Sequence, residues 1–165
     1  MSHFLFGRVC FTEGDVQSNE MIFREALRET SGDELFAWIQ GEVSQPIIAA
    51  MLSEQLGERE KGEVNFLLTS SAEFNTSDEL LFDFDDSSST YSTTKLTKVC
   101  TQIVDFMACL KRYRIFSKIN LLMTEGYDST FEVKEIDENK LSQLMEEIVG
   151  NDGWYIPSLL IKILN

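Results

Sequence analysis

The hydrophobic positions of the first 58 residues change from one compact run to a helical spacing. The run over residues 4–11 is short and aromatic-rich, which predicts a buried strand. Apolar residues then recur every three or four positions over residues 16–58, which predicts a series of helices. Ser31 and Glu34 have the spacing of a capping box, so we expect a short helix that starts there and buries Trp38.

The rest of the chain alternates between strand-like and helix-like segments. Pro46 suits the first turn of a helix, and Gly57 suits the position just past its end. Further strands are expected over residues 64–69, 79–85, 118–124, 130–136 and 158–164, and further helices over about 94–114 and 137–150. These elements predict a single α+β domain over residues 1–165, with a mainly antiparallel or mixed sheet and helices packed on it.

Composition narrows the class of partner. The 165 residues include 28 Asp and Glu against 14 Lys and Arg, a formal net charge of −14. Such a surface repels DNA, RNA and anionic membranes, so none of these is expected as a direct ligand, and a basic partner is favoured. The hydrophobic fraction of 43% is too high for a disordered chain, and a chain of this length needs neither a disulfide nor a metal to fold.

Half of the net charge lies in one region of strand and loop, about thirty residues long. No basic residue occurs between Lys61 and Lys95, while this stretch contains seven acidic residues. Three of the carboxylates alternate along the predicted strand over residues 79–85 and therefore share its polar face. The first candidates for a partner-binding surface are Glu79, Asp83, Asp85 and the adjoining Asp86.

The last third of the chain contributes further candidates for partner contact. Asp152, Trp154 and Tyr155 belong to or follow a turn-rich loop that begins at Gly150, which favours their exposure. Trp and Tyr are enriched among the residues that dominate binding energy at protein interfaces. Asp128, in the loop before the strand over residues 130–136, completes the set.

The N-terminal residues and the cysteines indicate a reducing compartment. The chain begins without the basic and apolar regions of a secretory signal, and no window approaches the ~18 apolar residues of a membrane span. Cys100 and Cys109 lie nine residues apart in one predicted helix, on opposite faces, so they are not expected to pair. Reduced thiols and a cytoplasmic location follow.

The sequence contains one motif that suggests catalysis. Asp83-Phe84-Asp85 resembles the Asp-x-Asp motif of haloacid-dehalogenase-type phosphatases, in which a carboxylate attacks phosphorus beside a magnesium ion. Asp86 stands where that motif has glycine, and the same two aspartates are also the outward face of an amphipathic strand. His3 is the only histidine, and no glycine-rich phosphate loop occurs. We therefore expect no enzyme, and no catalytic, cofactor or metal residues.

The end of the chain carries a family resemblance. The segments SKINLLMTEGYD (residues 117–128) and MEEIVGNDGWYIP (residues 145–157), together with the acidic, motif-free α+β pattern, resemble immunity proteins of bacterial contact-dependent growth inhibition systems. These proteins share a role rather than one set of residues, so the resemblance assigns no residue a function by position.

The resemblance implies a stoichiometric protein inhibitor. Its partner would be the basic C-terminal toxin domain of a surface-delivered effector, often a nuclease such as a tRNA-cleaving ribonuclease, and a larger assembly with elongation factor Tu is conceivable. Two other classes stay open on the residues alone. One is the small magnesium-dependent phosphatase that uses Asp83 and Asp85, and the other is an acidic adaptor with no inhibitory role.

Overall fold

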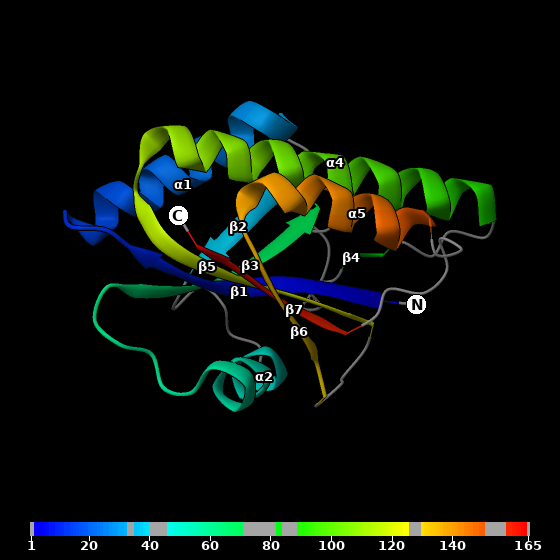
Figure 1. The fold of residues 1–165 in the computed structure, drawn as a ribbon. Coiled ribbons are helices and arrows are strands. Elements are labelled where there is room, and N and C mark those ends of the chain that lie inside the picture. Colours follow the sequence, from blue (N-terminus) through cyan, green and yellow to red (C-terminus); the bar gives the residue numbers. More distant parts are fainter. Residues whose placement is uncertain are drawn as a thin grey trace.

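One sheet with helices on both faces organises the computed structural model (Figure 1). The structure describes residues 2–32, 35–39, 46–70, 82–83, 89–125, 130–150 and 158–164. Its strands are β1 (Ser2–Phe11), β2 (Leu35–Ile39), β3 (Glu63–Ser70), β4 (Phe82–Asp83), β5 (Phe116–Glu125), β6 (Glu132–Ile136) and β7 (Leu159–Leu164). Its helices are α1 (Val16–Ser31), α2 (Pro46–Leu56), α4 (Ser89–Tyr113) and α5 (Leu141–Gly150), with a 3₁₀ turn over Glu138–Lys140.

The first strand forms the centre of the sheet. Within the described ranges the strand order is β2-β3-β1-β5-β7-β6, and β4 pairs with the N-terminal end of β1. All neighbouring strands are antiparallel except β6 and β7, which are parallel. The α+β class with a mainly antiparallel, mixed sheet is therefore confirmed.

Gly7 allows the strands to approach closely at the middle of β1. A Cβ atom at this position would overlap the backbone carbonyl of Asn120 on β5 and lie 2.8 Å from the Phe66 ring on β3. Phe66 in turn packs on Phe23 of α1, with ring centroids 5.2 Å apart. The missing side chain thus leaves room for the Phe66 ring.

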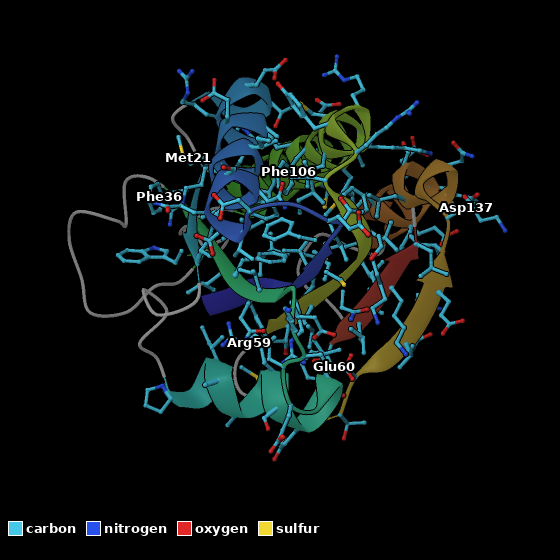
Figure 2. The ribbon with its side chains drawn as sticks, turned by 90° about the vertical axis from the view of Figure 1, so that its left-hand side faces the viewer. Met21, Phe36, Arg59, Glu60, Phe106 and Asp137 are labelled. Atoms are coloured by element: carbon cyan, nitrogen blue, oxygen red, sulfur yellow. The ribbon has the colours of Figure 1, made fainter. Side chains whose placement is uncertain are left out.

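The two faces of the sheet are covered unequally. Three helices, α1, α4 and α5, lie on one face, and α2 lies alone on the other (Figures 1 and 2). The larger core beneath the three helices is built around Phe23, whose ring meets Phe106 of α4 at a centroid distance of 5.0 Å. The smaller core beneath α2 joins Ile48 and Leu52 to Phe6 of β1.

The structure corrects the helix expected to start near Ser31. Residues 35–39 form the edge strand β2, which pairs antiparallel with β3. Leu35, Ala37 and Ile39 are buried and alternate with half-buried neighbours, the period of a strand. The five residues LFAWI are all apolar, so they fit the spacing of a helix as well as that of a strand. Pairing with β3 makes them a strand.

Most other predicted elements are confirmed, with shifted ends. α2 begins at Pro46 and stops before Gly57, whose φ of 73° suits a residue that follows a helix. The Asp137 carboxylate accepts the backbone N–H of Lys140 at 3.2 Å and so caps the start of the last helical segment. The helix expected near residue 94 begins earlier, at Ser89. Of the strand expected over residues 79–85, the described part contains Phe82–Asp83.

On the α2 side, side chains form rows across the sheet. An apolar row, which α2 covers, consists of Trp38, Leu67, Phe6, Leu122 and Leu160. The next row is polar and consists of Asn65, Arg8, Asn120, Lys162 and Glu135.

Arg8 connects this polar row to the end of α2. The side chain is only 5% exposed, and its Nε donates to Asn65 Oδ1 at 2.8 Å. Its Nη atoms donate to the backbone carbonyls of Leu56 at 3.3 Å and Gly57 at 3.1 Å, where the helix leaves its carbonyls without partners. Glu63 lies 3.5 Å from the guanidinium and balances its charge.

Replacing Arg8 by lysine should destabilise the fold while keeping the charge. An ammonium group cannot reach Asn65 and the carbonyls at the end of α2 at once, so several of these part-buried acceptors lose the donor that the guanidinium supplied. We expect the free energy of unfolding to fall by about 2–3 kcal/mol in urea titrations. The matched control is Arg59→Lys in the exposed loop after α2 (Figure 2), which should change stability by less than about 0.5 kcal/mol. Equal stability of the two variants would contradict the anchoring role of Arg8.

Candidate functional site

The residues predicted to bind a partner are mostly outside the described ranges. Asp83 is the exception: its backbone lies in β4 and pairs with Ser2 of β1. Glu79, Asp85, Asp86, Asp128, Asp152, Trp154 and Tyr155 all lie outside the described residues. Both the acidic surface and the Asp83–Asp85 pair therefore stay predictions.

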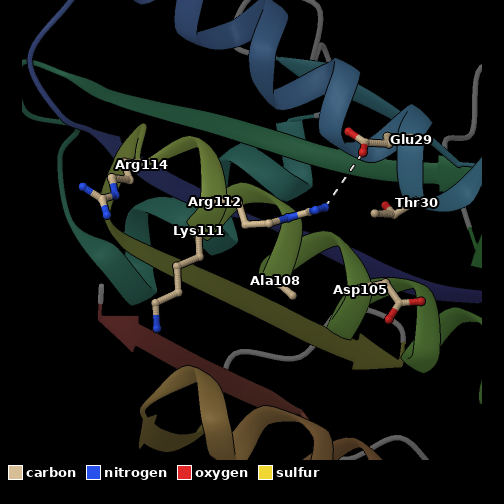
Figure 3. A pocket seen from close by; sticks show the side chains of 7 residues that line it. All are labelled: Glu29, Thr30, Asp105, Ala108, Lys111, Arg112 and Arg114. Carbon is tan, nitrogen blue, oxygen red and sulfur yellow. Dashed lines mark ion pairs between the residues drawn. The ribbon is translucent and has the colours of Figure 1, made fainter.

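One candidate surface is an open basin at the C-terminal end of α4 (Figure 3). It has a volume of about 900 Å³ and is lined by Glu29, Thr30, Asp105, Ala108, Lys111, Arg112 and Arg114. Basic side chains are favourable at this end of a helix because they offset the negative end of its dipole. Arg114 follows the helix with φ of 55°, and its carbonyl accepts the Thr12 hydroxyl at 3.1 Å.

The positive charge of the basin is partly used to join two helices. Glu29 of α1 accepts a hydrogen bond from the Tyr113 hydroxyl at 3.0 Å and from the Cys109 thiol at 3.5 Å. Arg112 lies 3.8 Å from the same carboxylate, as Figure 3 shows. The hydrogen bond to this carboxylate raises the pKa of Tyr113, because it stabilises the protonated phenol. Glu29 thus acts as a link between α1 and α4 and leaves the basin with mixed charge.

A second candidate surface is the groove between α4 and α5. It has a volume of about 400 Å³ and is lined by Thr97, Cys100, Thr101, Val104, Asp105, Ser142, Met145, Glu146, Val149 and Gly150. Cys100 and Met145 are buried, and Val104 and Val149 are half-buried, so the floor is apolar. Asp105 of α4 and Glu146 of α5 are exposed on opposite sides of it.

The two carboxylates of the groove differ from many others in lacking a cationic partner. Across the described ranges, ion pairs hold Glu25, Glu29, Glu63, Glu132 and Glu135. Within those same ranges, neither Asp105 nor Glu146 forms an ion pair, and no basic residue is among those that line the groove. The groove therefore combines an apolar floor with uncompensated negative charge at its rim.

The two helices that form the groove are close, along the chain, to segments that contain predicted partner-binding residues. Because α4 and α5 are antiparallel, the start of α4 and the end of α5 lie at the same end of the pair (Figure 1). Asp85 and Asp86 shortly precede Ser89, and Asp152, Trp154 and Tyr155 shortly follow Gly150. The sequence did not indicate the groove itself, because Asp105 and Glu146 come from helices that meet only in the fold.

The described residues contain neither a membrane-spanning helix nor a cluster of metal ligands. None of the described helices is both long and apolar enough to cross a membrane. Among the described side chains, no group of three or more His, Cys, Asp or Glu residues is arranged to hold a metal ion. Comparison with protein-family models, with curated proteins and with solved structures finds no match for this chain.

All three cysteines are free, as the sequence predicted. Cys100 lies at the groove beside α5, whereas Cys109 contacts Glu29 of α1, so the two thiols occupy opposite flanks of α4. Burial raises the pKa of Cys100 to about 12, and it raises the pKa of Cys109 as well. The reactive thiolate is therefore scarce at both positions.

Alkylation should distinguish these thiols in the native protein. With Cys100 at a pKa of about 12, about one molecule in ten thousand carries its thiolate at pH 8. Iodoacetamide at pH 8 should modify half-buried Cys10 at least about tenfold faster than Cys100 or Cys109, measured by peptide mass spectrometry. In denaturant all three should react. Equal native rates, or a mass consistent with a Cys100–Cys109 disulfide, would contradict the packing of α4.

Proposed function

We propose that this chain is a cytoplasmic immunity protein, a non-catalytic inhibitor that binds a basic toxin domain in a stoichiometric complex. The observation that carries the proposal is the excess of carboxylates, 28 acidic against 14 basic residues, on a chain with an ordinary folded core. Excess charge of this size lowers the stability of a compact state through self-repulsion, so its presence favours a role in recognition.

A nuclease is the class of toxin that this charge suits best. A nuclease holds phosphate groups in a basic cleft, and a carboxylate-rich protein surface presents the same sign of charge to that cleft. Complementary fields raise association rates to as much as ~10⁸–10⁹ per molar per second at low salt. Fast capture suits an inhibitor that must act before its target is cleaved.

Unpaired carboxylates in the described part support the same interpretation. Asp105 and Glu146 have no ion pair within the described ranges, although Lys111 and Arg112 follow Asp105 on α4. Exposed ion pairs add little to folding stability, so the fold loses little by leaving these two carboxylates unpaired. These carboxylates therefore remain available to cations on a partner.

The gene immediately upstream provides the test. We expect it to encode a long effector that ends in a basic domain of roughly 100–300 residues, the size of one or two domains. When the two are produced together, that domain should co-purify with the chain in a 1:1 complex and lose its toxicity. A metabolic operon at this position, or toxicity that persists with equimolar chain present, would overturn the proposal.

The acidic segment around β4 should set the rate of association. Asp83→Lys with Asp85→Lys should slow binding of the basic domain at least about tenfold at low ionic strength, because steering by the segment is lost. The difference should shrink as salt approaches ~0.5 M, where charges are screened within a few ångströms. Stopped-flow fluorescence across a salt series measures both effects. An unchanged rate with intact folding would move the interface away from this segment.

A further inference from the structure

We propose that the groove between α4 and α5 receives a lysine or arginine side chain of the partner. Its aliphatic stem would lie on the apolar floor, and its cation would lie between Asp105 and Glu146. The proposal rests on the proposed function only for the identity of the partner. The groove itself is defined by this chain's own side chains.

The floor of the groove suits an aliphatic stem. Val104 and Val149 come from facing helices and are half-buried, so each leaves apolar surface accessible. Cys100 and Met145, both 2% exposed, close the bottom. Lysine and arginine are the side chains that combine an apolar stem with a terminal charge, and they commonly bury the stem along apolar surface.

The groove is large enough to hold a side chain of a partner. Its volume of about 400 Å³ is near the lower end of the range of about 300–1,000 Å³ that is typical of ligand pockets. An extended segment or loop that projects one or two side chains can therefore enter it.

The rim of the groove selects for a positive charge. Asp105 and Glu146 lie on opposite helices, and among the described residues that line the space Cys100 is the only other ionisable one. Asp105 also borders the basin that contains the basic residues further along α4. Arg112 there lies 3.8 Å from Glu29, and Asp105 forms no ion pair within the described ranges. A cation between the two carboxylates would be attracted by both at once.

The same charge distribution disfavours other occupants. A second copy of this chain would bring another net charge of −14, and its approach would be opposed by repulsion between like charges. Nucleic-acid phosphates would be repelled by Asp105 and Glu146 in the same way. A neutral apolar ligand would leave both carboxylates without a counter-charge, so it gains nothing from the rim.

The first test uses a small probe that mimics an arginine side chain. We would titrate n-butylguanidinium into the full chain and follow methyl resonances by NMR. The methyl groups of Val104, Met145 and Val149 should shift along one saturable curve. n-Butanol, which has the same stem without the charge, should bind about fivefold or more weakly. No shift in these methyl groups, or equal binding of both probes, would overturn the proposal.

Charge-neutral variants locate the binding site. Asp105→Asn with Glu146→Gln should weaken n-butylguanidinium binding about fivefold or more, since both counter-charges are lost while the shape stays similar. Glu13→Gln with Glu54→Gln is the matched control, because it removes two exposed carboxylates that have no ion pair within the described ranges and lie outside the groove. Equal loss in both variants would show a general charge effect and would overturn the groove as the site.

The second test separates this proposal from the proposed function. With the upstream basic domain, Asp105→Asn with Glu146→Gln should raise Kd about tenfold, and the matched control should have a much smaller effect. If that domain binds the double variant as tightly as wild type, the groove is wrong and the inhibitor role stands. If no basic domain binds the chain but n-butylguanidinium fills the groove, the inhibitor role fails and the groove stands.

Discussion

The arrangement of the sheet face that α2 covers depends on the contacts of the buried Arg8 guanidinium. A charged group removed from water is costly unless its donors find partners and its charge is balanced. Asn65, Glu63 and the carbonyls at the end of α2 meet both needs. They do so only if α2 stops at Leu56 and the chain turns at Gly57. One side chain of the central strand therefore holds the end of the helix in place.

The position of α2 then follows from the rows of the sheet. With its C-terminal end held at the polar row, its apolar side lies over the row that contains Phe6, Leu67, Leu122 and Leu160. The two rows are adjacent because side chains on one face of a strand recur every second residue. Phe6 and Arg8 are such neighbours on β1, so one strand supplies both the small core and its anchor.

The α1–α4 and α4–α5 interfaces in the layer of three helices are held together by different contacts. Between α1 and α4, Glu29 joins Cys109, Arg112 and Tyr113, so charge and hydrogen bonds connect the helices. Between α4 and α5, apolar side chains meet below an open groove whose rim carries unpaired carboxylates. An acidic protein can use its few basic residues to join its own helices, and the carboxylates that remain are available for a partner.

The sequence by itself determined the elements whose signals are local. The aromatic run of β1, the start of α2 at Pro46, the cap at Asp137 and the apolar run of β7 depend on neighbouring residues, and all four agree with the structure. The excess of acidic residues favours a basic partner, which stays a prediction. Tertiary structure decided the rest. LFAWI became a strand because β3 pairs with it, and Arg8 became an anchor because α2 ends beside it. The α4–α5 groove exists because residues about forty positions apart in the sequence pack together. Local hydrophobic patterns do not predict contacts between such distant residues.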